Sequence, residues 1–180
     1  AIFVSAGGPG AIVATALRTL QRIPPVSRAA LAAVYPTLRP HGPASDPFAL
    51  LLDVGATVQC TSEDLVTFAA MGAAYASKIS SIERPRVALL SNGTASSGAP
   101  PRVRDAHRRL LQSPSGFEYV GCLRADHVTS GDADVIVTDG FTGDVLLRTL
   151  EGVAATGELL IKRAAERFVA TFRPYDYVVA

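Results

Sequence analysis

The stretch Phe48-Ala49-Leu50-Leu51-Leu52, followed directly by Asp53-Val54-Gly55-Ala56, indicates the fold class of this 180-residue chain. Five apolar residues in a row predict a β-strand that is buried on both faces, because a half-exposed strand would alternate apolar and polar positions. Such strands are typical of parallel sheets with helices on both faces. The glycine that follows predicts a tight turn at the carboxyl end of the strand.

Strands and helices are expected to alternate on both sides of this stretch. Thr61 is a predicted helix N-cap, with Asp64 as a weaker form of the capping box, and residues 36–47, which contain four prolines, are expected to form a loop. The order predicts one α/β domain over residues 1–180, with a mainly parallel, doubly wound sheet. The other expected strands are 2–6, 29–35, 86–90, 117–121 and 134–138, and the expected helices are 10–22, 61–79, 102–112 and 143–170.

The composition excludes several classes of protein. Hydrophobic residues make up 48% of the chain and charged residues 18%, which is too apolar for a disordered protein. The formal charge is only +1, without a long basic run, which argues against a nucleic-acid-binding protein. Cys60 and Cys122 lie outside any CxxC pair and away from a His at ligand spacing, so a zinc site is not supported. No metal and no cofactor are expected.

Four predicted turns each combine glycine with a small polar or acidic residue directly after an apolar strand. They are residues 5–10, 53–56, 91–98 and 139–143. Because the carboxyl ends of parallel strands meet at one edge of the sheet, where ligands bind, the turns together predict a polar, glycine-lined pocket.

The first of these turns, Ser5-Ala6-Gly7-Gly8-Pro9-Gly10-Ala11, precedes the helix expected at 10–22. Proline suits the first turn of a helix, and amides at a helix start favour an anion such as phosphate. The spacing matches neither the Walker pattern nor the full dinucleotide fingerprint. A tight strand-to-helix connection without a ligand is therefore the open alternative.

The helix expected at 143–170 is amphipathic and contains Gly157, where it either continues or breaks into a helical hairpin. Charged residues recur along it at spacings near three and four. The favoured interpretation is a helix that faces the core or a dimer partner. The alternative is a surface that touches a bilayer.

Several motifs, taken in chain order, resemble the PlsX phosphate acyltransferases of bacterial phospholipid synthesis, and the resemblance runs through nearly all of the chain. It rests on Ser5-Ala6-Gly7 with Gly10-Ala11, Gln21-Arg22-Ile23-Pro24, Leu52-Asp53-Val54-Gly55-Ala56, Phe68-Ala69 with Met71-Gly72 and Tyr75-Ala76, Ile82-Glu83-Arg84-Pro85-Arg86-Val87, Ser130-Gly131-Asp132-Ala133-Asp134-Val135, Asp139-Gly140-Phe141-Thr142-Gly143 and Thr149-Leu150-Glu151-Gly152.

This resemblance implies a fold similar to the isocitrate/isopropylmalate dehydrogenases and phosphotransacetylase. It implies an enzyme that transfers a fatty acyl group from acyl carrier protein to inorganic phosphate, giving acyl phosphate. It also implies a cytoplasmic homodimer that associates peripherally with the inner face of the membrane. Relative to the family, an opening βα portion and a closing portion are expected to be missing from this sequence.

The chain also departs from the family pattern at polar positions. Gly8-Pro9 replace Asn-Thr, Thr57 and Asp144 each replace an Asn, Ser91-Asn92-Gly93-Thr94-Ala95 replace Asn-Ile-Gly-Glu-Glu, and Gly98-Ala99-Pro100 replace Lys-Gly-Asn. The amide and lysine donors that an oxyanion needs are thus largely changed. Arg102 or Arg104 is a candidate to replace the lysine.

Roles in acyl transfer follow from the positions of the remaining polar groups. Ser91, Asn92 and Asp139 are the predicted catalytic residues, with the amides of the loop at 91–98 and Asn92 donating to the oxyanion. Asp139 and Asp53 either orient a donor or form a helix cap or turn, and the second interpretation is favoured for both. The predicted phosphate-binding residues are Ser5, Gly7, Gly8 and Gly10, and the predicted pocket-lining residues are Asp53, Gly55, Thr57, Gly93, Gly98, Gly140 and Gly143.

Two alternatives to an active phosphate acyltransferase stay open at the level of sequence. One is a catalytically impaired homologue that binds acyl chains, carrier protein or another partner. The other is an acyltransferase of specialised metabolism that uses a different acceptor. Fold alone does not decide between them.

Overall fold

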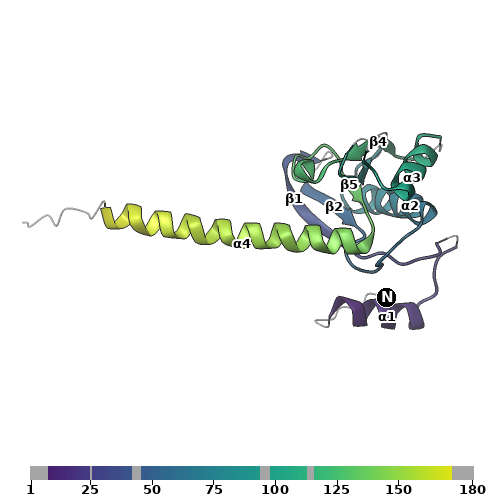
Figure 1. Cartoon of the computed structure of the whole chain (residues 1–180), viewed down its shortest axis with the longest axis horizontal. Helices are drawn as coiled ribbons and strands as arrows, with labels where there is room; N and C mark the ends of the chain where they lie inside the picture. The colour runs from purple at the N-terminus through teal and green to yellow at the C-terminus, as the bar shows by residue number, and fades with distance from the viewer. Residues whose placement is uncertain (1–7, 25, 42–45, 94–97, 113–115, 172–180) are drawn as a thin grey trace, which may run out of the picture. The chain divides into compact units, whose positions relative to one another are not determined.

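The computed structural model describes residues 8–24, 26–41, 46–93, 98–112 and 116–171 (Figure 1). The chain divides into two units, Ala1–Asp144 and Val145–Ala180. The strand expected at residues 2–6 lies outside the described residues.

The first unit contains a five-stranded sheet with strand order β1-β2-β5-β3-β4. The strands β2, β5, β3 and β4 are parallel to their neighbours, and only β1 pairs antiparallel, with β2. This arrangement confirms the expected α/β fold with a mainly parallel sheet. The strands are β1 (Ala32–His41), β2 (Asp46–Leu52), β3 (Arg86–Leu90), β4 (Glu118–Leu123) and β5 (Val135–Val137).

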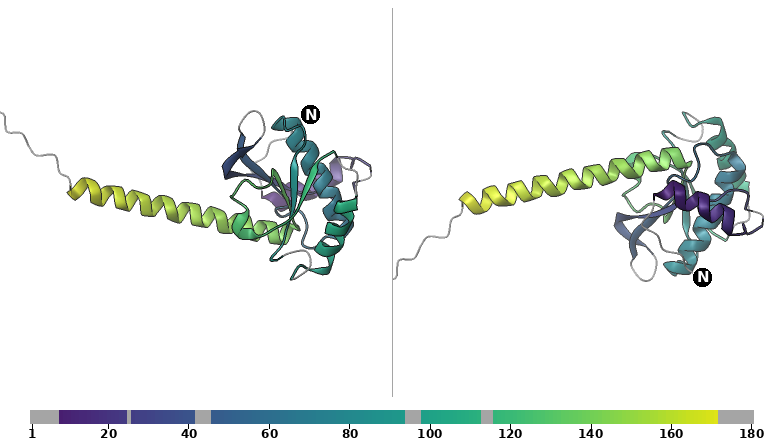
Figure 2. Two further views of the ribbon diagram at one scale, coloured as in Figure 1. Left: turned by 90° about the horizontal axis from the view of Figure 1, so that it is seen from above. Right: turned by 90° about the horizontal axis from the view of Figure 1, so that it is seen from below.

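The core lies between the sheet and the helices α2 (Ser62–Ile79) and α3 (Pro101–Gln112), which contact each other within the first unit (Figure 2). Alternate residues of the central strands face this core, because successive side chains of a strand point to opposite faces. The intervening residues Leu51, Ala88 and Ile136 are buried as well. The central strands are therefore covered on both faces, as their continuous apolar sequences predict.

Helix α2 begins and packs as its sequence predicts. The Thr61 hydroxyl accepts from the Asp64 amide at 3.2 Å and the Asp64 carboxylate accepts from the Thr61 amide at 2.8 Å, which completes the capping box. Gly72 allows a close approach to the sheet, since a Cβ there would lie 2.5 Å from Cγ1 of Val135. The small residues of α2 thus bring the helix onto β5.

The prediction of a loop over residues 36–47 is wrong at both ends. Strand β1 continues from Pro36 to His41 and pairs with β2, so that Pro36 lies opposite Phe48. Because β1 is an edge strand, its prolines need not donate to a second neighbour. Three of the four prolines therefore lie in paired strands, Pro36 and Pro40 in β1 and Pro47 in β2, and Pro43 lies outside the described residues.

The other elements differ from expectation mainly at their ends. Helix α1 spans Pro9–Thr19 and stops three residues before the expected end, and β4 runs on to Leu123, shortly before the 3₁₀ helix η1 (Ala125–His127). Strand β5 is shorter than the strand expected at residues 134–138.

Helix α4 (Gly140–Thr171) is continuous through Gly157, so the structure has one long helix where a hairpin was the alternative. In the second unit it exposes Val153, Leu160 and Ile161. No helix in the described part of the chain combines the length and the apolar character needed to cross a bilayer.

Candidate active site

The turns after three neighbouring strands lie at one edge of the sheet. Strands β2, β5 and β3 are adjacent and parallel, so their carboxyl ends point the same way. The segments that follow them are residues 53–57, 138–142 and 91–93. The structure therefore brings together three of the four turns expected to form the pocket.

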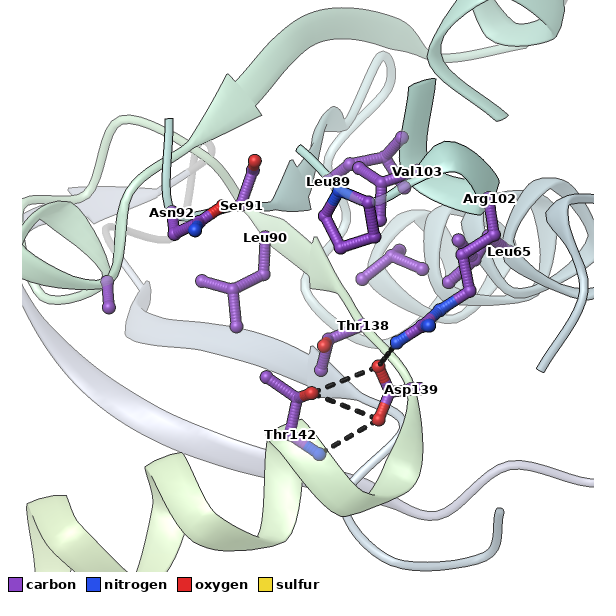
Figure 3. A pocket seen from close by; sticks show the side chains of 13 residues that line it. Leu65, Leu89, Leu90, Ser91, Asn92, Arg102, Val103, Thr138, Asp139 and Thr142 are labelled. Atoms are coloured by element: carbon purple, nitrogen blue, oxygen red, sulfur yellow. Dashed lines mark hydrogen bonds and ion pairs between the residues drawn. The ribbon is translucent and has the colours of Figure 1, made fainter. Parts of the chain in front are cut away.

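A pocket of ≈ 290 Å³ opens at this edge (Figure 3). Its walls are largely apolar, and its polar groups gather at the ends of β3 and β5 and at the start of α3. Apolar walls with a few convergent polar groups are typical of small-molecule sites. The lining residues are Leu65, Leu89, Leu90, Ser91, Asn92, Pro100, Arg102, Val103, Ala125, Val137, Thr138, Asp139 and Thr142.

Asp139 lies between Thr142 and Arg102 and directly precedes α4. Its carboxylate accepts from the Thr142 amide at 2.9 Å, from the Thr142 hydroxyl at 3.0 Å and from Nη2 of Arg102 at 2.8 Å (Figure 3). Burial favours the neutral acid, but the hydrogen bonds from Thr142 and Arg102 outweigh it and lower the pKa of Asp139 below its usual value. Asp139 is therefore an ionised helix cap, as expected, and also the partner of Arg102.

Arg102 stands in the first turn of α3 and reaches across the pocket to Asp139. Its side chain is 38% exposed, whereas that of Asp139 is 7% exposed. The Nε of Arg102 is buried and has no hydrogen-bond partner among the described residues. Arg104, the other arginine suggested by the sequence, is exposed and donates from Nη1 to the Ala99 carbonyl at 2.8 Å.

Ser91 and Asn92 line the pocket at the end of β3. Ser91 is buried and its hydroxyl accepts from the Gly93 amide at 3.4 Å, whereas Asn92 is exposed. A substrate in the pocket can therefore reach both side chains. Gly93 and Gly98, predicted to line the pocket, flank it in the same connection but do not appear in its wall.

Asp53 builds a turn beside the pocket and does not line it. Its buried carboxylate accepts from the amides of Leu31, Gly55, Ala56 and Thr57 at distances of 2.8 to 3.1 Å. These bonds occupy both carboxylate oxygens. Of the two interpretations offered by the sequence, the structure supports turn formation.

The turn after β2 packs directly on the start of α4. Thr57 accepts from the Gly140 amide at 3.1 Å through its hydroxyl oxygen. A Cβ on Gly140 would lie 2.3 Å from the Thr57 carbonyl oxygen, and one on Gly143 would lie 1.9 Å from that of Asp53. Asp53, Gly55, Thr57, Gly140 and Gly143, all predicted to line the pocket, thus belong instead to the junction that positions Asp139.

The phosphate-binding turn expected at the first helix contributes no described residue to this pocket. Gly8 is the N-cap of α1 and Gly10 lies in its first turn, both in open surroundings. Ser5 and Gly7 lie outside the described residues.

Two kinds of pocket residue were not predicted from the sequence. Thr142 had a usable signal, because it stands three residues after Asp139, at the spacing of a helix-capping pair. The apolar wall residues, such as Leu65 and Val103, had none, because helical apolar positions are the same whether they face a core or a pocket.

The fold and the candidate site together define an α/β protein with a pocket at the carboxyl edge of its sheet. A solved structure, a phosphotransacetylase from Streptococcus pyogenes, is similar with a TM-score of 0.59 and 20% identity over 83% of this chain and 49% of its own. At this identity the likeness shows the fold alone, and it confirms the expected phosphotransacetylase-like architecture.

Residues 1–172 match the family described as "Fatty acid synthesis protein", and the chain belongs to that family. Curated relatives named "Phosphate acyltransferase" come from Myxococcus xanthus (44% identical, over 91% of this chain and 44% of the relative), Paracoccus denitrificans (40%, over 94% and 45%) and Lactococcus lactis subsp. cremoris (40%, over 89% and 46%). These matches confirm the resemblance to the PlsX phosphate acyltransferases. The chain spans less than half the length of these relatives.

Proposed function

We propose that this chain carries the acyl-transfer pocket of an enzyme that moves a fatty acyl group from acyl carrier protein to inorganic phosphate. The product is acyl phosphate, which feeds phospholipid synthesis. The observation that supports this most is the pocket itself, whose largely apolar walls also carry Ser91, Asn92, Arg102 and Asp139. The family membership supports the same reaction.

The reaction asks little acid–base chemistry of the protein. A phosphate oxygen attacks the thioester carbonyl, a tetrahedral oxyanion forms, and it collapses as the C–S bond breaks and the carrier thiolate leaves. The protein has to hold two reactants together and stabilise the oxyanion. Ser91 and Asn92 are the proposed oxyanion donors, because both present side-chain donors to the pocket at the end of β3.

Asp139 is proposed as the residue that holds Arg102 at the pocket. An ionised carboxylate accepts hydrogen bonds and donates none, so Asp139 does not itself stabilise an oxyanion. Its contacts with Thr142 fix it at the start of α4, and its contact with Nη2 of Arg102 fixes the guanidinium opposite.

Trapping of the product tests this proposal. The full chain is incubated with acyl carrier protein thioester and phosphate, and acyl phosphate is captured with hydroxylamine as a hydroxamate. We expect hydroxamate that depends on both protein and phosphate. No hydroxamate above the protein-free control, in conditions where a relative from the family is active, would reject the enzyme.

A homologue that binds acyl chains or carrier protein without this chemistry is the second candidate. It is favoured by the pairing of Arg102 with Asp139, which neutralises the positive charge at the pocket. Saturable binding of acyl carrier protein thioester, together with absence of hydroxamate, would identify this second function.

We further propose that the protein is a cytoplasmic homodimer that associates peripherally with membranes. Support comes from α4, whose exposed Val153, Leu160 and Ile161 offer apolar surface for a partner or a lipid. Light scattering after size exclusion tests the dimer, with a monomer mass as the contradicting result. Liposome flotation tests the membrane contact, which is rejected if the protein stays in the soluble fraction.

A further inference from the structure

Arg102 is the one cationic side chain among the described residues that line the pocket. It projects from the first turn of α3, and Pro100 and Val103 beside it form part of the same wall. The positive end of the α3 dipole therefore lies at the wall that carries the guanidinium (Figure 3). Both features favour a negatively charged ligand at this wall once Arg102 leaves Asp139, whose carboxylate offsets the charge of the guanidinium while the two are paired.

Asp139 is held in place by Thr142 as well as by Arg102. Three hydrogen bonds from the amide and hydroxyl of Thr142 reach its two oxygens, at 2.9, 3.0 and 3.0 Å. If Arg102 moved toward a ligand, Asp139 would keep these bonds. The pair is therefore built so that its cationic member can exchange partners.

Arg102 also has hydrogen-bonding capacity that the described residues do not use. Its guanidinium carries five N–H donors in a planar fork, of which Nη2 is bonded to Asp139 and the buried Nε has no partner among those residues. Buried donors without a partner are uncommon in native proteins. A ligand with several acceptor oxygens would satisfy the fork once the side chain moves and brings the buried Nε to it.

We propose that Arg102 binds a phosphate group in this pocket, exchanging or sharing its contact with Asp139 as the ligand enters. The assignment rests on the proposed function, in which phosphate is the acceptor, and it names the side chain that holds it. Arginine suits this task because its fork matches phosphate oxygens in a bidentate manner. Arg104 does not share the role, because it is exposed and bonded to the Ala99 carbonyl.

The phosphate group has two possible sources, which share one chemistry. It is either the free acceptor or the phosphate of the phosphopantetheine arm that carries the acyl group. The experiment therefore titrates the full chain with inorganic phosphate and, separately, with 4′-phosphopantetheine, and measures each dissociation constant by calorimetry. The variants are Arg102→Met, Arg102→Lys and the matched control Arg109→Met, an exposed arginine of the same helix that pairs with Asp105.

We expect Arg102→Met to weaken binding of at least one probe by tenfold or more, and the probe affected identifies the source. Arg102→Lys keeps the charge but loses the fork, so its affinity should lie between those of wild type and Arg102→Met. Arg109→Met should bind like wild type. Thermal melts show that each variant is folded.

Equal affinity of wild type and folded Arg102→Met for both probes would overturn the assignment, and so would failure of the wild type to bind either. The result is independent of turnover. A chain that forms no acyl phosphate but binds phosphate through Arg102 rejects the proposed function and retains this inference. A chain that forms acyl phosphate, and whose KM for phosphate is unchanged in Arg102→Met, retains the proposed function and rejects this inference.

Discussion

The hydroxyl oxygen of Thr57 accepts a hydrogen bond from the Gly140 amide at 3.1 Å, which joins the turn after β2 to the first residue of α4. The Asp53 carboxylate holds the turn on one side of this contact, and Asp139 caps α4 on the other. The position of Asp139 in the pocket therefore depends on residues that do not line the pocket.

Replacing Thr57 by valine should destabilise the chain with little change of shape. The substitution leaves the buried Gly140 amide without its acceptor, which costs about 1–3 kcal/mol. The loss is measured as the change in the free energy of unfolding from urea titration. The control is Thr156→Val. The exposed hydroxyl of Thr156 donates to the Gly152 carbonyl in the same helix, so this substitution should change the free energy of unfolding by less than about 0.5 kcal/mol. Equal free energies of unfolding for Thr57→Val and Thr156→Val would contradict the contact between Thr57 and the Gly140 amide.

Alanine at two glycines of α4 should have opposite effects. A Cβ on Gly143 would lie 1.9 Å from the Asp53 carbonyl oxygen, so Gly143→Ala should cost about 3 kcal/mol as the junction is forced apart. A Cβ on Gly152 would meet no described atom within 4 Å, so Gly152→Ala should stabilise the helix by roughly 0.5–1 kcal/mol. Thermal melts of both variants measure the difference, and a tolerated Gly143→Ala would refute the close packing.

Asp139 should contribute to the loss of stability in acid. Its pKa is lower in the folded chain than the usual value of 3.8, because the bonds from Thr142 and Arg102 outweigh its burial. Its stabilisation is therefore present above pH 3.8 and is lost as the pH falls through the folded pKa. Asp139→Asn should give a shallower decline of unfolding free energy between about pH 4 and pH 2.

Some decline should remain in Asp139→Asn, since the pKa of Asp64 is also lowered, its burial being outweighed by hydrogen bonds from Thr61 and Ser27. The control is therefore the wild type titrated in parallel over the same range. Identical slopes in the two proteins would show that Asp139 is not held by the contacts described.

The Cys60 thiol should react slowly in the folded protein. Burial, and to a lesser degree the nearby charge of Asp139, raise its pKa to about 11, and burial raises the pKa of Cys122 as well. Because the thiolate is the reactive form, alkylation near neutral pH should be much slower in the native chain than in guanidinium. Peptide mass spectrometry identifies the labelled cysteine. Rapid labelling of Cys60 in the native chain would contradict its burial.

Much of the fold was predictable from local pattern, because the apolar runs at Phe48–Leu52 and Arg86–Leu90 and the Thr61 cap each indicate their structure within a few residues. The antiparallel β1 was not predictable in the same way. Pro36 and Pro40 indicate a loop unless the strand is known to lie at an edge, and edge position is a property of the whole sheet.

The candidate site was predictable in its location but not in its contacts. The position of the turns at strand ends followed from chain order. The pairing of Arg102 with Asp139 joins residues 37 positions apart and depends on how α3 packs on the sheet, which no spacing encodes. For the same reason the sequence could not separate the glycines of the junction, such as Gly140, from those of a pocket wall.

The formation of acyl phosphate is the most direct test that this chain carries the acyl-transfer pocket. The full chain is mixed with acyl carrier protein thioester and inorganic phosphate, and the reaction is followed by phosphorus NMR. We expect an acyl phosphate resonance that grows with time and is absent when either the thioester or the protein is left out. A spectrum that shows only inorganic phosphate, while an active family member produces the new resonance under the same conditions, would contradict it.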